Sequence, residues 1–139
     1  MNESFSEYLL YEPILRMLTA RGDIVECEVI CPGIKQLKAG DKKRLDFVAR
    51  KGNLTLAIEV KWAKTTRPNI DDDLIKLNAC RKRDRTWRAF LCVFGKKSCI
   101  AKLKLPTEVL AERGRQVIAD FGKTKFGCRV YELAEPSRS

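Results

Sequence analysis

Two carboxylates and a lysine interrupt a segment that otherwise has the pattern of an ordinary β-hairpin. In RLDFVARKGNLTLAIEVKW, residues 44–62, apolar and polar residues alternate on both sides of a Gly-Asn pair. This pattern predicts two antiparallel strands and a tight turn, because strand side chains alternate between faces and this pair tolerates the positive φ of such turns. Asp46 lies on the first arm, and Glu59 and Lys61 lie on the second. Two carboxylates with a lysine can bind a hard metal ion and act on a phosphate ester.

The position of the turn determines which residues face each other across the hairpin. Counting back from the Gly-Asn pair places Asp46 opposite Glu59. The next pair on that face is Arg44 with Lys61. The other face is apolar and core-facing, with the pairs Leu45 with Val60, Phe47 with Ile58 and Ala49 with Leu56. A slip of one residue would move this apolar set to the wrong face, so the pattern supports the register, although a longer loop would shift it.

Two acids that face each other in a sheet need an explanation. Like charges opposed on neighbouring strands destabilise a sheet by roughly 0.2–1 kcal/mol per pair. Either one acid is protonated or a cation lies between them. A divalent ion bound by both carboxylates and by substrate phosphate oxygens would remove the repulsion, with Mg²⁺ the usual choice and Mn²⁺ a substitute. The alternative is a solvated face that carries two unrelated acids.

Composition narrows both the chemistry and the partners. The 139 residues fit one domain, and the formal net charge is +10. A small domain this basic is typical of polyanion binding, with nucleic acid the first candidate, and the alternative is a basic surface without a partner. The chain has no histidine, which excludes Ser-His hydrolysis, histidine-based nucleases and histidine-containing zinc sites.

The sequence also predicts a cytoplasmic location without a membrane partner. The N-terminal stretch MNESFSEYLLYEP lacks the basic and apolar regions of a secretory signal, and no apolar run approaches the ~20 residues of a membrane span. No two of the six cysteines have C-x-x-C spacing, and several lie within apolar runs. We therefore expect buried free thiols in a reducing compartment.

The hairpin belongs to a predicted α/β arrangement. The expected elements are a helix to Ala20 that Pro13 kinks or divides, a strand over 23–31, the hairpin, a helix over 69–85, a strand over 87–95, a short helix at Thr107–Arg113 and a last strand at Cys128–Leu133. Asn69 is the expected N-cap of helix 69–85, whose charges match the helix dipole at both ends. These elements predict an α/β sandwich around a central mixed sheet.

Asp46, then twelve residues, then Glu59-Val60-Lys61 resembles the signature of the PD-(D/E)XK nuclease superfamily, which has the restriction-endonuclease-like fold. The apolar run LTLAI before the E-x-K and the order of elements are also similar, over residues 5–95. The spacing is similar to that of archaeal-type Holliday junction resolvases, and Leu45 replaces the nominal proline of the signature. The resemblance implies one domain over residues 1–139 with an αβββαβ core, its mixed sheet flanked by helices.

The resemblance also implies an activity, that of a metal-dependent deoxyribonuclease that hydrolyses phosphodiester bonds. Asp46, Glu59 and the main-chain carbonyl of Val60 would bind Mg²⁺. Lys61 would orient or help to deprotonate the attacking water and offset charge on the phosphate. No histidine is needed, because a metal ion that bridges phosphate and water lowers the pKa of the water. The flanking carboxylates should keep Lys61 charged, which favours electrostatic help over a role as free base.

Many such enzymes add an acid from the first helix, and Glu7 is the first candidate here. It precedes by three residues an apolar stripe that comprises Leu10, Ile14, Met17 and Leu18. The alternative is that Ser4 and Glu7 form a capping box. Glu12 falls off the stripe, and Glu28 in the first strand is a further candidate from its position.

Basic residues around the predicted site suit contacts with phosphates, which give affinity without sequence information. They are Lys42, Lys43, Arg44, Lys64, Arg67, Lys76, Arg81 and Arg83. The alternative for those at the end of helix 69–85 is interaction with the helix dipole. Trp62 and Trp87 could stack on bases, but we expect mainly structural roles, since Trp62 falls on the core-facing side of the hairpin.

The sequence therefore predicts a Mg²⁺-dependent nuclease that acts on DNA in preference to RNA. It lacks a zinc finger or helix-turn-helix signature, which favours recognition of structure, junctions, ends or single strands over a specific sequence. A homodimer is an expectation of the resemblance where both strands are cut. One alternative is an inactive protein of the same fold that binds nucleic acid or a protein partner. Another is a basic interaction protein whose hairpin charges are incidental.

Overall fold

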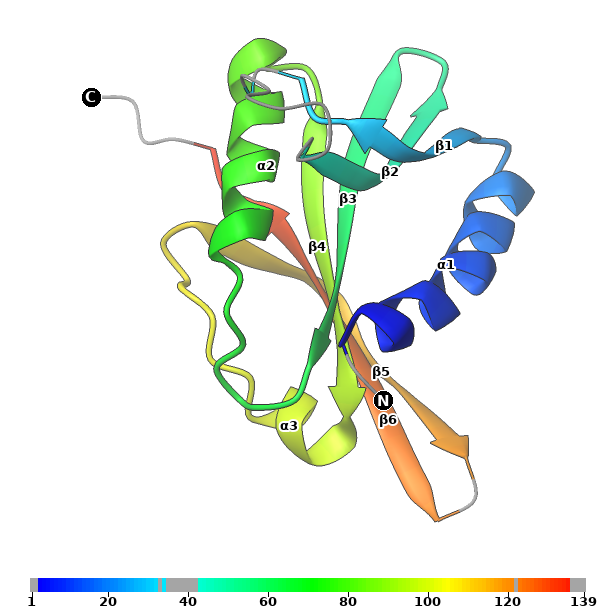
Figure 1. Cartoon of the computed structure of the whole chain (residues 1–139), viewed down its shortest axis with the longest axis vertical. Helices are drawn as coiled ribbons and strands as arrows, with labels where there is room; N and C mark the ends of the chain where they lie inside the picture. Colours follow the sequence, from blue (N-terminus) through cyan, green and yellow to red (C-terminus); the bar gives the residue numbers. More distant parts are fainter. Residues whose placement is uncertain (1–2, 33, 35–42, 122, 136–139) are drawn as a thin grey trace.

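The computed structural model describes residues 3–32, 34, 43–121 and 123–135, and their side chains except those of residues 3–9, 120 and 121. A six-stranded mixed sheet lies between helices (Figure 1). The elements are α1 (Glu3–Ala20), β1 (Ile24–Ile30), β2 (Arg44–Lys51), β3 (Leu54–Ala63), α2 (Asp71–Arg83), β4 (Arg88–Lys96), α3 (Lys97–Ala101), β5 (Leu110–Phe121) and β6 (Thr124–Leu133). The expected α/β class with a mixed sheet flanked by helices is confirmed.

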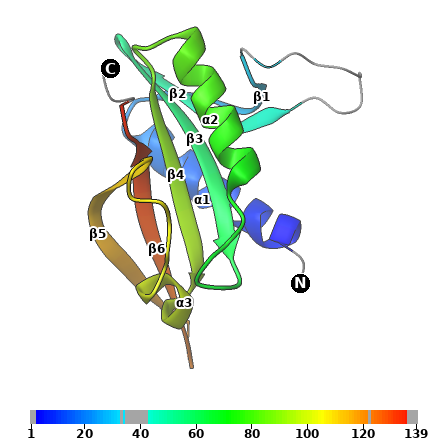
Figure 2. The ribbon, with the colours of Figure 1, turned by 90° about the vertical axis from the view of Figure 1, so that its left-hand side faces the viewer.

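The strands lie in the order β1-β2-β3-β4-β6-β5. β3 and β4 are parallel, and the other neighbouring strands are antiparallel. The parallel pair requires a crossover, and α2 supplies it between the end of β3 and the start of β4. In Figure 2, α2 lies in front of the sheet and α1 lies behind it.

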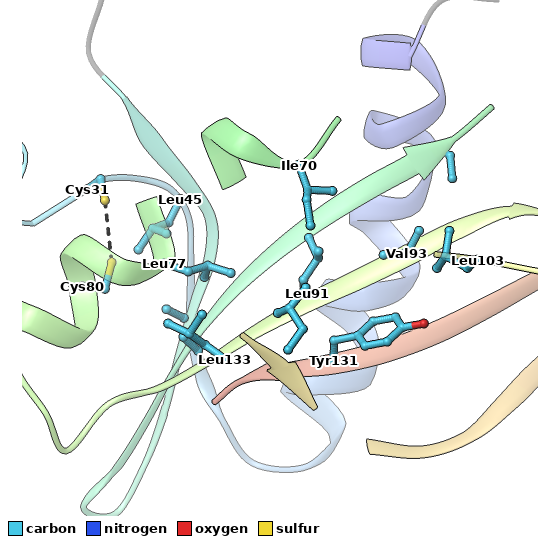
Figure 3. Close-up of a cluster of buried hydrophobic side chains, with 14 of the residues drawn as sticks. Cys31, Leu45, Ile70, Leu77, Cys80, Leu91, Val93, Leu103, Tyr131 and Leu133 are labelled. Carbon is cyan, nitrogen blue, oxygen red and sulfur yellow. Dashed lines mark hydrogen bonds between the residues drawn. The ribbon is translucent and has the colours of Figure 1, made fainter. Parts of the chain in front are cut away.

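Apolar side chains fill both sides of the central strands. The cluster on the α1 side comprises Ile14, Leu18, Phe47, Ala49, Leu56, Ile58 and Val60. The cluster on the α2 side is larger and includes Val48. Figure 3 labels other members of this cluster, among them Leu45, Leu77, Leu91, Val93 and Tyr131. β2 and β3 therefore contribute buried residues to both faces, and a polar side chain on either strand must find a partner inside the fold.

The N-terminal half follows the prediction closely. α1 reaches Ala20 as one helix with Pro13 inside it, so the proline does not divide the helix. Gly22 has a φ of 86°, the left-handed conformation that commonly ends a helix. The strands predicted over 23–31 and 87–95 are β1 and β4, and the hairpin is β2 and β3 with Gly52 at a φ of 59° in the turn.

The region after β4 departs from the prediction. No helix forms over Thr107–Arg113, because β5 begins at Leu110 and pairs with β6. The last strand begins before Cys128, and α3 was not expected. A register shift between Arg113 and Val117 interrupts the β5–β6 ladder. The shift breaks the strict alternation of side chains, which is the sequence signal for a strand.

Two helical details also differ from the prediction. Met17 is 60% exposed, so the apolar stripe of α1 is narrower than expected. Ile70 occupies the N-cap position of α2, and the side-chain oxygen of Asn69 accepts a hydrogen bond from the Asp71 N–H at 3.1 Å. Across the described residues, the helices are too short or too polar to cross a bilayer.

The close contact of β3 and β4 predicts that Gly95→Ala destabilises the chain. A Cβ atom at Gly95 would lie 2.5 Å from the main-chain oxygen of Ala63 and 3.3 Å from a methyl carbon of Ile100. Relief of this overlap requires backbone movement, which costs about 1–3 kcal/mol of unfolding free energy. Urea unfolding followed by tryptophan fluorescence measures the loss. Lys96→Ala, at the exposed neighbouring residue, is the control, and equal midpoints for the two variants would contradict the prediction.

Candidate active site

The ladder between β2 and β3 stops next to the two predicted acids. Its pairs run from Lys51 with Leu54 to Phe47 with Ile58, which confirms the register expected from the turn. Beyond Ile58, β3 continues beside β4 as far as Ala63. In Figure 1 the two strands run together from the hairpin tip and then part. The acids are therefore located where β2 leaves β3.

Carboxylate groups replace main-chain hydrogen bonds at this point. The Asp46 N–H donates to Oε1 of Glu59 at 3.1 Å. The Val60 N–H donates to Oδ2 of Asp46 at 2.7 Å. Each acid thus accepts a hydrogen bond from a main-chain N–H of the opposite strand and satisfies a donor that the parting strands would leave unpaired. This gives a structural reason for two acids in a hairpin that enters the core.

The two acids are close, but they do not face each other on one side of the sheet as expected. Asp46 accepts a hydrogen bond from the Tyr11 hydroxyl of α1, whereas Glu59 contacts Lys76 of α2. The expected pairing of Leu45 with Val60 on one core face is also wrong, because these residues pack in clusters on opposite sides. The alternation of β2 is broken at Asp46, where the strand leaves the ladder.

Backbone strain in β1 accompanies this irregularity. Glu28 has a φ of 54°, which costs roughly 1–2 kcal/mol for a residue with a Cβ atom. The Tyr11 hydroxyl lies 3.1 Å from Oε1 of Glu28 and also donates to Asp46, so it joins the acids of β1 and β2. Burial and these two carboxylates raise the pKa of Tyr11. Strained residues other than glycine are concentrated at functional sites, which supports this location.

Glu59 is the most deeply buried acid of the group. It is 1% exposed, and Nζ of Lys76 lies 2.8 Å from its Oε2 atom. Burial and the neighbouring Asp46 raise the pKa of Glu59 to about 9, although Lys76 opposes the shift. Burial also raises the pKa of Asp46, despite its hydrogen bonds from Tyr11 and Val60. Both acids therefore favour the protonated state more than ordinary carboxyls do.

α2 contributes two charged residues to the site, Asp73 and Lys76. From the sequence, Lys76 is expected to contact phosphates and Asp73 is not expected at the site. Lys61 lies 4.0 Å from Oδ2 of Asp73, and the side chains are 16% and 12% exposed. Lys76 also donates to the main-chain oxygen of Arg44 at 3.0 Å. Burial lowers the pKa of Lys76, but the carboxylates of Glu59, Asp46 and Asp73 outweigh burial and raise it. The dipole of α2 accounts for acids in its first turn, so the sequence signal that singles out Asp73 is its i,i+3 spacing to Lys76.

The remaining acids expected near the site are not all brought to it. Glu28 shares the Tyr11 hydroxyl with Asp46. Glu12 forms an exposed ion pair with Arg16 within α1. Glu7 lies in α1, but its side chain is outside the described residues. Among the described side chains, the acid that lies beside Lys61 is Asp73 of α2.

The predicted phosphate-binding residues fall into three groups. Lys43 and Arg44 interact with residues of the chain itself. Nζ of Lys43 lies 3.2 Å from a carboxylate oxygen of Asp72, and Arg44 donates a hydrogen bond to the main-chain oxygen of Glu28 at 3.2 Å. Arg81 is used inside the fold, where it donates to the main-chain oxygen of Leu133 at 2.8 Å. Exposed positions are held by Lys64, Arg67 and Arg83. Lys76 belongs to the acid cluster, and Lys42 lies outside the described residues.

The two tryptophans, Trp62 and Trp87, pack against other side chains of the fold. Trp62 and Phe126 place their ring centroids 5.8 Å apart. Trp87 packs against the α2-side cluster, and the Arg50 guanidinium lies 5.8 Å from its ring centroid. These contacts agree with the structural interpretation of both residues.

The donor set at the acids fits a hard divalent cation. Asp46 and Glu59 offer carboxylate oxygens, and the carbonyl of Val60 points to the same side of β3 as its N–H, toward Asp46. The Lys76 ammonium contacts a carboxylate oxygen of Glu59 and the main-chain oxygen of Arg44, which shows that the oxygens around Glu59 attract positive charge. Among the described residues, no three Cys, Asp or Glu side chains form a complete metal cluster. A cation here would rely on main-chain and substrate oxygens as well.

The burial of Glu59 predicts that stability falls as the pH rises. Its carboxyl has a pKa of about 9 in the folded chain and an ordinary value of 4.5, so folding retains a proton that the unfolded chain releases. This stabilisation is fully present below the pKa of Glu59 in the unfolded chain. It is lost as the pH rises from that value to the pKa of Glu59 in the folded chain. The free energy of unfolding should therefore decrease between pH 5 and 9, by on the order of 2–4 kcal/mol.

The free energy of unfolding, measured by urea titration in the presence of EDTA at a series of pH values, tests this expectation. Because the chain has no histidine, few other groups titrate between pH 5.5 and 7.5. Glu59→Gln should flatten the slope in this range. Glu112→Gln, which removes an acid paired with Arg129 at the surface, should leave it unchanged. Equal stability of the wild-type chain at pH 5.5 and pH 8 would contradict the prediction.

Comparisons of the chain with protein-family models, curated proteins and solved structures found no match. Near the point where β2 and β3 part, the fold brings together the buried Glu59, the half-buried Asp46, the main-chain carbonyl of Val60 and the lysines Lys61 and Lys76.

Proposed function

We propose that this chain is a metal-dependent nuclease that hydrolyses phosphodiester bonds in DNA, on the core of the PD-(D/E)XK superfamily. The observation that carries the proposal is the exchange of hydrogen bonds by which Asp46 and Glu59 stay together where β2 and β3 part. Carboxyls whose pKa values are raised by burial are concentrated at functional sites, and a bound cation would favour the ionised form of both acids. The order of elements from α1 to β4 is compatible with an αβββαβ core.

The residues that would hold the metal ion are Asp46, Glu59 and the carbonyl of Val60. A bound Mg²⁺ or Mn²⁺ would lower the pKa of a coordinated water and offset charge on the phosphate. Lys61, on the same strand two residues beyond Glu59, would place its ammonium against a phosphate oxygen. Asp73, 4.0 Å away, positions that ammonium. Lys76 holds the second oxygen of Glu59 and so orients the carboxylate.

The surface charge supports a polyanionic substrate. Lys64 and Arg67 are exposed directly after β3, next to the strand that carries Glu59 and Lys61. Such residues bind phosphates without reading bases, which suits recognition of DNA structure or ends. A homodimer would supply a second site for the opposite strand of a duplex.

Cleavage of labelled single-stranded, duplex and branched DNA tests the proposal. We expect cutting with Mg²⁺ or Mn²⁺ and none with EDTA. Lys61→Ala should lower the rate by at least about 100-fold, because the lysine acts on charge that develops during the reaction. Asp46→Asn should abolish cutting. Lys97→Ala, at an exposed lysine of α3, is the matched control and should cut at the wild-type rate.

One observation favours the alternative of an inactive nuclease-like protein that binds nucleic acid. The ion pair between Lys76 and Glu59 compensates charge in the cluster without any metal ion. On this alternative, DNA binds tightly, its affinity falls with salt, and no metal ion produces cutting. That outcome, with a folded wild-type chain, would reject the nuclease. Binding that is lost in Arg67→Ala while cutting is absent would identify the binding module.

A further inference from the structure

Two buried thiols face each other between the end of β1 and α2 (Figure 3). The Sγ atoms of Cys31 and Cys80 lie 3.6 Å apart, although the residues are 49 positions apart in the chain. The residues are 2% and 0% exposed. Within the described ranges, no third cysteine or carboxylate joins them to make a group that could hold a metal ion. The chemistry open to this pair is therefore that of a dithiol.

The surroundings of the two sulfurs are different. The hydrogen bond from the Cys80 thiol lowers the pKa of Cys31, and the ammonium groups of Lys76 and Lys43 act in the same direction against burial. The same hydrogen bond, together with burial, raises the pKa of Cys80. Thiolates are the nucleophiles in exchange reactions. Cys31 is thus the attacking sulfur and Cys80 the resolving one.

We propose that Cys31 and Cys80 form an oxidisable pair that closes to a disulfide when low-molecular-weight disulfides accumulate. The Cys31 thiolate attacks one sulfur of a disulfide such as oxidised glutathione and releases one glutathione thiolate. Cys80 then loses its proton and attacks the Cys31 sulfur, which releases the second glutathione. Two electrons pass from the protein to the oxidant, and the two thiol protons end on the two released glutathiones. This inference goes beyond the nuclease proposal and does not rest on it.

The two sulfurs themselves move little on closure, but Cys31 is 2% exposed, so the oxidant reaches it through a local opening at the end of β1. The sulfurs must approach from 3.6 Å to about 2.05 Å. The Cys31 thiol, which now donates to the main-chain oxygen of Lys76 at 3.3 Å, would lose this hydrogen bond. Oxidation therefore acts on the turn of α2 whose lysine contacts Glu59. It also ties β1 to α2 and restricts the unfolded chain, which raises the Tm.

The experiment equilibrates the full-length chain with glutathione redox buffers, with and without urea, followed by acid quenching, alkylation and non-reducing tryptic mass spectrometry. The tryptic peptide 22–35 carries both Cys27 and Cys31, so Cys27→Ser, at an exposed residue, is the background. In native buffer, we expect a link from peptide 22–35 to peptide 77–81 that exceeds every other cysteine pair by at least about 10-fold. In urea, the pairs should be mixed, because the native approach of the two sulfurs is lost.

A second readout is the Tm of the oxidised and reduced Cys27→Ser chains. The oxidised form should melt about 5 °C or more above the reduced form, and Cys80→Ala on the same background should show no difference between redox states. Full alkylation of Cys31 and Cys80 after native oxidation would overturn the inference. A link that forms only in urea, or Cys31 paired equally with other cysteines, would also overturn it. The mass readout uses a chain with both thiols intact, so a poorly folded Cys80 variant does not affect it.

Discussion

The exchange of two main-chain ladder bonds for two carboxylate bonds at Asp46 and Glu59 is the interaction on which the rest of the site depends. An ordinary hairpin would continue to pair through its main chain. Here each acid accepts an N–H from the opposite strand, so β2 can leave β3 without orphaned donors. The departure lets Leu45 reach the α2-side cluster, which keeps the parted strand anchored in the core.

The helices on both faces of the sheet supply partners to the two acids, but these partners do not offset the cost of removing the carboxylates from water. α1 supplies the Tyr11 hydroxyl to Asp46, and α2 supplies the Lys76 ammonium to Glu59. Desolvation nevertheless dominates the pKa of both acids, which remain above their ordinary values. A buried ion pair is weak evidence for stability, because apolar residues of similar size often stabilise a fold more. Together with the strained Glu28, the cluster is better explained by function than by folding.

The sequence was informative where local periodicity and one turn determine structure. The Gly-Asn turn alone predicted the register from Lys51 to Phe47. It could not predict that the strands part at Asp46, because alternation implies a continuous ladder and the partners that break it lie on α1 and α2. Asp73 and Lys76 follow a helical spacing that a dipole or a surface explains equally well, so their role depends on where α2 packs. The sequence does not predict β5 for a related reason: the register shift in this strand interrupts the alternation of apolar and polar residues that indicates a strand.

The buried stripe of α2 connects these observations. Asp73, Leu77 and Cys80 are the residues that this helix buries against the sheet, and Lys76 lies beside them. A stripe that served only packing would be apolar at each of these positions. Here its first position is an acid beside Lys61, and its last is a thiol in contact with Cys31. Lys76 contacts both the acid cluster and the sulfur pair, since its ammonium binds Glu59 and its main-chain carbonyl accepts a hydrogen bond from the Cys31 thiol. A small shift of α2 would therefore change the acid cluster and the sulfur pair together.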